Sequence, residues 1–516
     1  MNTGTPQPSE APPGSGAERD AFRLLQARLP EMFRRVFAHD EAPRSVVVLP
    51  SFSLDADVMA KITGVEHYEE RMLCLLLLLR LPRTRVIFLS STPMPESVVD
   101  YYLHLLPGVP VRHARQRLTL LSCHDNTPRP LSAKILERPR LMERILDAIP
   151  DRAAAHMTCF NVSESERNLA LRLGIPIYGC DPELLPLGSK SGARRLFREA
   201  GIAIPEGFED LADAEELAEA LAALKAKKPD LRRAVVKLNE GFSGEGNAIF
   251  SFEDAPSGPA LAPWVREHLR GLRFEAAGMT WDLYKSKVRE MQAIVEAFIE
   301  GPAKRSPSAQ FRVDPTGGLE VISTHDQVLG GSAQQIFLGC RFPADEAYRL
   351  AIQEEGLKAA RLLRDRGVIG RFGVDFISVP EAGGWRHYAI EVNLRKGGTT
   401  HPYLMLQFLT DGHYDPASGL YLAPGGRPCF YCASDNIEDE RYRGLTPDDL
   451  IDIAVLNGLH FHAATQEGVV FHMFGTLSQF GKFGMACLGG TPERARALYD
   501  EALAVLDRAV QQTEAG

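Results

Sequence analysis

The sequence lacks any hydrophobic run long enough to cross a membrane. Its most apolar stretch, LCLLLLLRL from Leu73 to Leu81, falls well short of the roughly 20 residues that a transmembrane helix needs, so we interpret it as a buried helix. The first twenty or so residues are rich in Pro, Gly, Ser and Glu and lack the apolar core of a secretory signal, which is typical of a disordered tail. We therefore expect no membrane partner and no secretion by that route.

Cysteine is also scarce. The eight cysteines are spread from Cys74 to Cys487 without the density or spacing of a disulfide framework, which suits a reducing compartment. Cys429 and Cys432 form a lone C-x-x-C, but a zinc site needs a second pair, and the histidines downstream match no standard zinc knuckle or finger. The sequence therefore predicts reduced thiols and a cytoplasmic protein.

An excess of positive charge is missing as well. The formal net charge is −9 and the pI is near 5.9, so nucleic acid is not an expected partner. At 516 residues the chain is too long for one hydrophobic core. We predict an α/β (α+β) protein with a disordered tail (1–20), an α/β domain with a parallel sheet (21–178), a central nucleotide-binding domain (179–424) and a small C-terminal α+β domain (425–516). Nothing in the sequence indicates an oligomeric state.

Polar side chains interrupt an otherwise apolar strand in AIEVNLRKGG, Ala389 to Gly398. Glu391, Asn393 and Arg395 alternate there with Ile, Val and Leu, so the three polar groups share one strand face. Burying a carboxylate without a partner costs several kcal/mol or forces it to protonate, so Glu391 needs a cation. A divalent metal is the natural candidate.

A second carboxylate, Asp375, lies just upstream in the apolar run RFGVDFISV. The intervening PEAGGW is turn material, so the two runs are predicted to form an antiparallel hairpin. Asp375, Glu391 and Asn393 would then form a hard oxygen site suited to Mg²⁺, with Mn²⁺ as the alternative. The competing interpretation is a hairpin whose polar residues face water, but the apolar residues that flank each acid argue against it.

A glycine-rich loop follows the strand that carries Lys237. Glycines let backbone N–H groups approach phosphate oxygens closely. The expected contacts in this loop are Gly241, Ser243, Gly244 and Gly246. Because a second strand follows the loop, where Walker A and dinucleotide-binding motifs require a helix, both of these motifs are excluded. A flap that folds over a triphosphate is the remaining phosphate hypothesis, beside a simple turn.

Two lysines are candidate phosphate ligands. Lys237 lies on the apolar strand AVVKL, where an ammonium needs an anionic partner to remain charged. Lys190 stands at the start of a predicted helix and either binds phosphate or is a solvated helix cap.

The strand AIVEAFIEG, Ala293 to Gly301, is the candidate adenine site. Adenine needs an apolar slot with one donor and one acceptor at its edge, which the backbone of an extended strand supplies. Glu296 would meet the exocyclic amine, although it is also interpretable as an ordinary strand acid. The nucleotide contacts expected on this strand are Glu296, Ala297, Ile299 and Glu300.

Taken in order, Lys190, Lys237 with its glycine loop, VEAFIEG, Asp375 and E-V-N-x-R resemble the ATP-grasp superfamily over roughly Leu187 to Pro402. EVNLRKGGTTHP is similar to the metal and catalytic strand of biotin carboxylases and carboxylate-amine ligases. VVVLPSFS, HDQVLGG and GVVFHMFGTLSQFGKFG resemble pheganomycin-type peptide ligases, in which a pre-ATP-grasp domain and a distinctive C-terminal domain flank the grasp.

The resemblance implies an activity. A substrate carboxylate would attack the γ-phosphate of ATP to give an acyl phosphate and ADP, and an amine would then displace phosphate to form an amide. Lys237 and Arg395 are the implied catalytic residues, with Arg395 holding the acyl phosphate. Glu300 would contact the ribose, because Pro302 and Ala303 stand where many relatives carry an acid.

The substrates would be a small-molecule carboxylate and amine, such as amino acids or peptides. Four basic residues are candidate substrate ligands: Arg312, Arg371, Lys396 and His401. Two other hypotheses remain open: a nucleotide-binding regulatory or scaffolding module without turnover, and an ATP-grasp kinase that stops after phosphorylating its acceptor.

Overall fold

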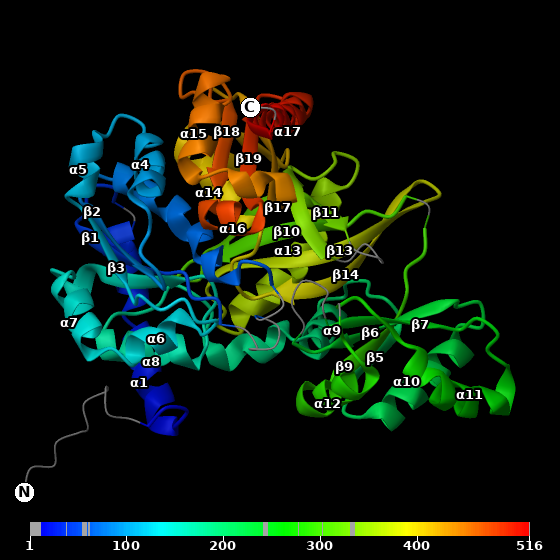
Figure 1. The fold of residues 1–516 in the computed structure, drawn as a ribbon. Helices are drawn as coiled ribbons and strands as arrows, with labels where there is room; N and C mark the ends of the chain where they lie inside the picture. Colours follow the sequence, from blue (N-terminus) through cyan, green and yellow to red (C-terminus); the bar gives the residue numbers. More distant parts are fainter. Residues whose placement is uncertain are drawn as a thin grey trace, which may run out of the picture.

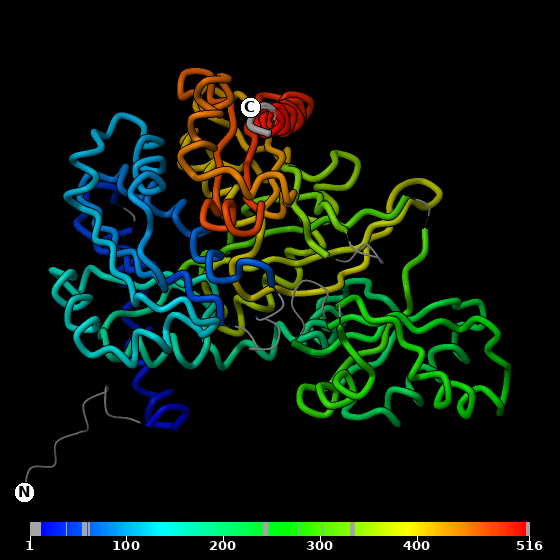
Figure 2. The backbone as a smooth tube through the Cα atoms, in the orientation of Figure 1, coloured from blue at the N-terminus to red at the C-terminus, as the bar shows by residue number. Residues whose placement is uncertain are grey.

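Three β-sheets and the helices around them organise the chain in the computed structural model (Figure 1). The structure describes residues 12–37, 39–53, 59, 62–240, 246–276, 278–301, 303–330 and 336–514. In Figure 2 the N-terminal part, blue to cyan, and the green five-stranded part lie on opposite sides of the long central strands. The predicted mixture of α and β structure is confirmed.

The N-terminal sheet is entirely parallel, in the order β3-β2-β1-β4. Its strands are β1 (Arg44–Leu49), β2 (Thr84–Ser90), β3 (Leu118–Ser122) and β4 (Ala155–Cys159). Its helices include α1 (Gly16–Gln26), α4 (Glu96–His104), α5 (Val111–Arg115), α6 (Leu131–Leu136), α7 (Pro139–Asp147) and α8 (Glu164–Leu173). β1 is buried along its whole length, as expected for a parallel strand covered on both faces. The predicted parallel sheet is confirmed.

The apolar run Leu73 to Leu81 lies mostly in the 3₁₀ segment η3 (Val65–Arg80). Leu73, Leu76 and Leu77 have no exposed surface, and they share one hydrophobic core with strands near the C-terminus. The predicted buried helix is therefore confirmed. Within the described residues, no helix combines the length and the hydropathy needed to cross a bilayer.

The second sheet is antiparallel, in the order β5-β9-β6-β7-β8. Its strands are β5 (Gly207–Leu211), β6 (Arg233–Leu238), β7 (Asn247–Ser251), β8 (Arg273–Phe274) and β9 (Ala293–Ala297). Helix α9 (Lys190–Glu199) precedes this sheet in the chain. The hydrophobic core of the sheet also contains residues of α10 (Ala214–Lys227), α11 (Leu261–His268) and α12 (Trp281–Met291). The expected adenine strand is shorter than predicted, because β9 ends at Ala297.

The central sheet is antiparallel and contains the order β14-β13-β10-β11-β12-β17. Its first strands are β10 (Pro307–Val313), β11 (Leu319–Gly330), β12 (Ile336–Phe342), β13 (Gly370–Glu381) and β14 (Gly384–Asn393). The later strands are β15 (His413–Asp415), β16 (Leu420–Leu422), β17 (Pro428–Glu438), β18 (Gly468–His472) and β19 (Lys482–Gly489). The larger helices associated with it are α13 (Arg349–Asp365), α14 (Thr400–Thr410), α15 (Pro447–Leu456) and α17 (Pro492–Glu514).

The predicted antiparallel hairpin is formed by β13 and β14. Asp375 pairs with Glu391 across the two strands, and Gly373 pairs with Asn393. A register irregularity follows Asp375, at Phe376. Sequence alternation and strand pairing together therefore place the two acids side by side.

Strands beyond residue 424 extend the central sheet. β17 pairs with β12 on one side and with β19 on the other, so the C-terminal strands are hydrogen-bonded to the sheet that carries the hairpin. Cys429 and Cys432 are buried free thiols on β17. Among the described residues, no group of three or more His, Cys, Asp or Glu side chains is placed to hold a metal.

Candidate active site

A cavity of about 360 Å³ is lined by the five-stranded sheet, the central sheet, the start of α9, segment η3 and β19. Its described lining carries six cationic and three acidic side chains: Arg71, Lys190, Lys237, Lys304, Arg395, Lys482, Glu296, Asp375 and Glu391. The excess of positive charge suits a polyanionic ligand.

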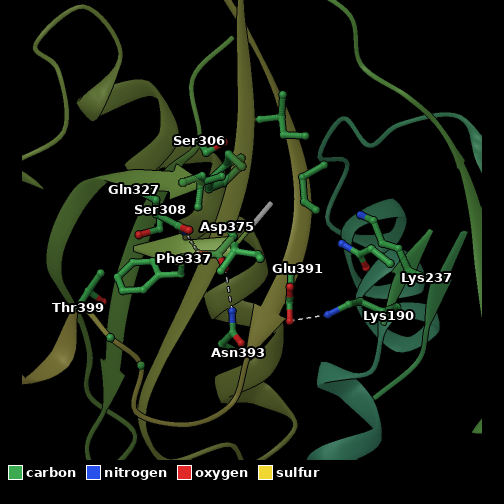
Figure 3. A pocket seen from close by; sticks show the side chains of 18 of the residues that line it. Lys190, Lys237, Ser306, Ser308, Gln327, Phe337, Asp375, Glu391, Asn393 and Thr399 are labelled. Carbon is green, nitrogen blue, oxygen red and sulfur yellow. Dashed lines mark hydrogen bonds and ion pairs between the residues drawn. The ribbon is translucent and has the colours of Figure 1, made fainter. Parts of the chain in front are cut away.

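Asp375 is held on one wall of the cavity by two amide side chains. Gln327 Nε2 donates to Asp375 Oδ1 at 2.9 Å, and Asn393 Nδ2 donates to Oδ2 at 2.9 Å (Figure 3). Burial, and then the negative charge of Glu391, raise the pKa of Asp375 to about 7. A carboxylate in this position gains stability when a cation binds beside it.

Glu391 faces the opposite wall. Its Oε1 lies 2.5 Å from Lys190 Nζ, an ion pair that joins the central sheet to α9 (Figure 3). Burial acts to raise the pKa of Glu391, but the ammonium of Lys190 and the guanidinium of Arg395 hold it below its ordinary value. Glu391 is therefore a charged carboxylate that already has a cationic partner.

The donor set of the hairpin fits a hard divalent cation. Two paired carboxylates and an amide provide oxygen ligands, and burial together with the negative charge of Glu391 raises the pKa of Asp375. Asp375, Glu391 and Asn393 are the residues that would hold Mg²⁺.

The first turn of α9 fixes Lys190. Ser189 caps the helix by accepting from the N–H of Gly192 at 3.0 Å. Asn239, which follows β6, accepts from the N–H of Ser191 at 3.0 Å and from its hydroxyl at 2.8 Å. The helix start is thus tied to the strand that carries Lys237.

Lys237 belongs to a buried ionic network. Its Nζ lies 2.7 Å from Glu296 Oε2, while Arg194 Nη1 lies 2.5 Å from Glu296 Oε1. All three side chains are almost completely buried. The charges of Lys237 and Arg194 outweigh the effect of burial and lower the pKa of Glu296. This network fixes the direction in which Lys237 points.

The segment after β9 forms an apolar wall through Ala297, Phe298 and Ile299. The Phe298 ring lies between two cations, with the Arg233 guanidinium 4.0 Å and the Lys304 ammonium 4.5 Å from its centre. Burial lowers the pKa of Lys304. An extended backbone beside an apolar wall is the arrangement that an adenine ring requires.

Two family models and two named relatives are similar to this chain in sequence. The family model "IQCH-like, ATP-grasp" matches residues 186–266 and 260–417, and the model "PGM1 C-terminal domain" matches residues 449–502. L-propargylglycine--L-glutamate ligase of Streptantibioticus cattleyicolor is 29% identical over 467 residues, which cover 89% of this chain and 93% of that protein. IQ motif-containing protein H of Danio rerio is 23% identical over 381 residues, 65% of this chain but only 36% of that protein.

Solved structures agree on the fold. A biotin carboxylase from Campylobacter jejuni, at 14% identity, superposes with a TM-score of 0.53 over 91% of this chain and 95% of its own. An N5-carboxyaminoimidazole ribonucleotide synthetase, at 12% identity, gives 0.50 over 90% and 97%.

Residues 186–417 therefore match an ATP-grasp domain. The chain is a ligase that forms C–N bonds. In the ATP-grasp site, five predicted residues line one cavity: Lys190, Lys237, Asp375, Glu391 and Asn393. Glu296, Ala297, Ile299 and Arg395 line it too.

Two acids expected to contact the nucleotide from the adenine strand have protein partners in the structure. Glu296 holds Lys237 and Arg194 with its two oxygens, so it positions cations and is not free for the exocyclic amine. Glu300 lies half exposed outside the cavity lining and binds Arg233 with both oxygens, at 3.0 and 2.7 Å. The ribose contact of Glu300 stays a prediction.

The glycine loop is described only in part. Gly241, Ser243 and Gly244 lie outside the described residues. The carbonyl of Gly246 accepts from the N–H of Leu238 and from the hydroxyl of Tyr284, at 3.0 and 3.1 Å. Gly246 thus has a hairpin-closing role here.

The four predicted substrate ligands do not line the cavity. Lys396 follows Arg395 and points away, donating to Thr158 Oγ1 at 3.0 Å and to the carbonyl of Cys159. Its pKa is lowered to about 8 by burial. His401 Nε2 lies 2.9 Å from His472 Nε2 in the core. Both residues tie segments of the chain together.

Arg312 and Arg371 are cross-strand partners two positions beyond the Gln310–Gly373 pair. Gln310 still lines the cavity, whereas the arginines lie past its end, with Arg312 paired to Glu320 at 2.5 Å. The cavity therefore ends before these two arginines.

Several lining residues were not predicted: Tyr68, Arg71, Lys304, Gln327, Asn436 and Lys482. Most stand in segments that carry no local motif and reach the cavity only through tertiary packing. Arg194 was detectable, because it lies four residues after Lys190 and such residues share a helix face.

Proposed function

We propose that this ligase joins the carboxyl group of one amino acid or peptide to the amino group of another, through an acyl phosphate, with Mg²⁺ bound at the hairpin. One observation carries the proposal: Asp375 and Glu391 are paired on rigid strands in the same cavity as Lys190, Lys237 and Arg395. That set combines the cation ligands and the phosphate cations that phosphoryl transfer needs. The full-length likeness to an amino-acid ligase supports the substrate class.

Different residues of the chain would bind the nucleotide and the metal ion. Lys190 and Lys237 would neutralise the ATP phosphates, while the backbone at Ala297 and Ile299 would meet the adenine edge. Asp375, Glu391 and Asn393 would hold Mg²⁺, which screens charge on the phosphates and orients them.

Arg395 would hold the transferred group. One oxygen of the substrate carboxylate attacks the γ-phosphorus, the bond to the β-phosphate oxygen breaks, and ADP leaves. The amine then attacks the acyl carbon, and the phosphate departs with that carboxylate oxygen as the amine loses a proton. Arg395 lines the cavity and is placed to stabilise the charge on the acyl phosphate and on the tetrahedral intermediate.

A pairwise screen tests the proposal. Amino acids and short peptides are mixed in pairs with ATP and Mg²⁺, phosphate release is measured, and products are identified by mass spectrometry. At least one pair is expected to release phosphate only when both partners are present and to yield an amide. Glu391→Gln should lower the rate by about 10²-fold or more, because the cation loses a charged ligand.

Glu381→Gln is the matched control. Glu381 lies near the turn of the same hairpin, is exposed and pairs with Arg386, so this variant should keep the wild-type rate. A phosphate ester as the product would make the protein a kinase. Phosphate release that does not need the amine, or that Glu391→Gln leaves unchanged, would contradict the ligase site.

A further inference from the structure

A buried cationic cluster forms a wall of the cavity that neither the nucleotide nor Mg²⁺ uses in the proposed mechanism. It contains Tyr68 and Arg71 from η3, Asn436 from β17 and Lys482 from the start of β19, all of which line the cavity. Arg71 and Lys482 are only 6% and 4% exposed. Segments more than 400 residues apart in the sequence therefore build this wall together.

Lys482 is a buried ammonium that lacks an acidic partner. Its Nζ donates to the hydroxyl of Tyr68 at 3.2 Å and lies 5.4 Å from the centre of that ring. Within the described part of the chain, no carboxylate forms an ion pair with it. A buried charge without a counter-ion is costly, so this position favours an anion that arrives with a ligand.

Arg71 adds a second, independent indication. Its Nη2 pairs with Asp435 at 2.5 Å, and its guanidinium carbon lies 4.0 Å from the Tyr68 ring centre. Its Nε is buried and donates to no acceptor among the described residues. Buried donors are nearly always satisfied in native proteins, so an unsatisfied donor in a cavity wall indicates a missing acceptor.

The charge of the cluster identifies the class of acceptor. Arg71 and Lys482 together face one acid, Asp435, which leaves a single positive charge. One charge matches a carboxylate better than a doubly charged phosphate. The amide nitrogen of Asn436, also in the lining, already donates to the carbonyl of Phe337 at 3.0 Å and to Asp435 Oδ1 at 3.2 Å, so the donors left for a ligand are those of Lys482 and Arg71.

We propose that Lys482, together with Arg71, binds the α-carboxylate of an amino-acid substrate, a group that takes no part in ligation. The inference rests on the proposed function and narrows it: the enzyme recognises a substrate with a free carboxylate besides the groups that react. Simple amines and amino-acid amides are then poor substrates.

Binding of common L-amino acids and their α-amides to the full-length protein tests this site without requiring turnover. Calorimetry is done with a non-hydrolysable ATP analogue and Mg²⁺ present. At least one free amino acid should bind, and its α-amide should bind about tenfold more weakly or worse, because a charge-assisted hydrogen bond is lost. Wild-type protein alone gives this result, so it does not depend on the folding of a variant.

Variants then assign the effect to Lys482. Lys482→Met should abolish the preference for the free acid and leave the affinity for the ATP analogue unchanged, whereas Lys482→Arg should retain part of the preference. Lys228→Met is the control, at the exposed C-terminal end of α10. It should show the same preference for the free acid as wild type.

Three outcomes overturn the assignment: no free amino acid binds, acid and amide bind equally to wild type, or Lys482→Met keeps the preference. Carboxylate-selective binding without ligation would refute the proposed function and leave this site standing. Ligation without carboxylate-selective binding would support the proposed function and refute this site.

Discussion

Four buried cationic side chains in this protein each have a carboxylate partner. Lys190, Lys237 and Arg194 each meet a carboxylate, and Arg71 meets Asp435. The alternation of polar and apolar residues in the sequence was enough to find Glu391, Asn393 and Asp375. It could not show that Glu296 would be used by two cations, because Arg194 and Lys237 reach it from different elements.

Buried neutral histidines give a prediction at this scale. His325 is fully buried, its Nε2 lies 2.5 Å from the hydroxyl of Tyr431, and burial lowers its pKa to about 3. Below pH 6.5 the unfolded chain binds a proton there and the folded chain does not, so stability falls as the pH drops from about 6.5 toward 3. At pH 5 the loss attributable to this side chain is about 2 kcal/mol.

His325→Gln keeps a hydrogen-bonding group but does not titrate. Chemical unfolding at pH 8 and pH 5 should show a loss of stability on acidification that is smaller than in wild type by about 2 kcal/mol. His113→Gln, at an exposed position in α5, should lose as much stability between pH 8 and pH 5 as wild type does. An equal loss in His325→Gln and wild type would show that His325 does not carry the penalty.

At the scale of elements, strand pairing determines the site and the loops limit what the sequence can predict. The β13–β14 hairpin and the β10–β11 hairpin were both predictable from apolar runs and turn residues. The end of β9 at Ala297 was not predictable, because Phe298 and Ile299 continue the apolar run after the strand leaves the sheet. The clustering of η3, β17 and β19 on one wall depends on long-range packing that no local pattern encodes.

The start of α9 gives the prediction at this scale. A Cβ on Gly192 would lie only 1.9 Å from the carbonyl oxygen of Pro186, so Gly192→Ala must displace the turn that carries Lys190. We expect a loss of about 1–3 kcal/mol in the free energy of unfolding and a higher KM for ATP. Denaturant titration and steady-state kinetics measure the two effects. Gly271→Ala, where a Cβ meets nothing within 4 Å, is the control. Wild-type KM and stability in Gly192→Ala would contradict this packing account.

At the scale of the whole molecule, N-terminal, central and C-terminal segments all line the cavity. The N-terminal segment η3, the five-stranded sheet, the central hairpin and the C-terminal strand β19 each contribute lining residues, and β17 joins the C-terminal strands to the central sheet. The predicted division at residue 424 remains a sequence-based prediction. What the structure adds is that strands on both sides of it belong to one sheet.

The central claim is that the carboxyl group is activated as an acyl phosphate in this cavity. Its most direct test uses a substrate pair from the screen, with the reacting carboxylate labelled with heavy oxygen. If the carboxylate attacks the γ-phosphate, each released phosphate carries one labelled oxygen, and ADP is the other product. Unlabelled phosphate, or AMP in place of ADP, would contradict the account.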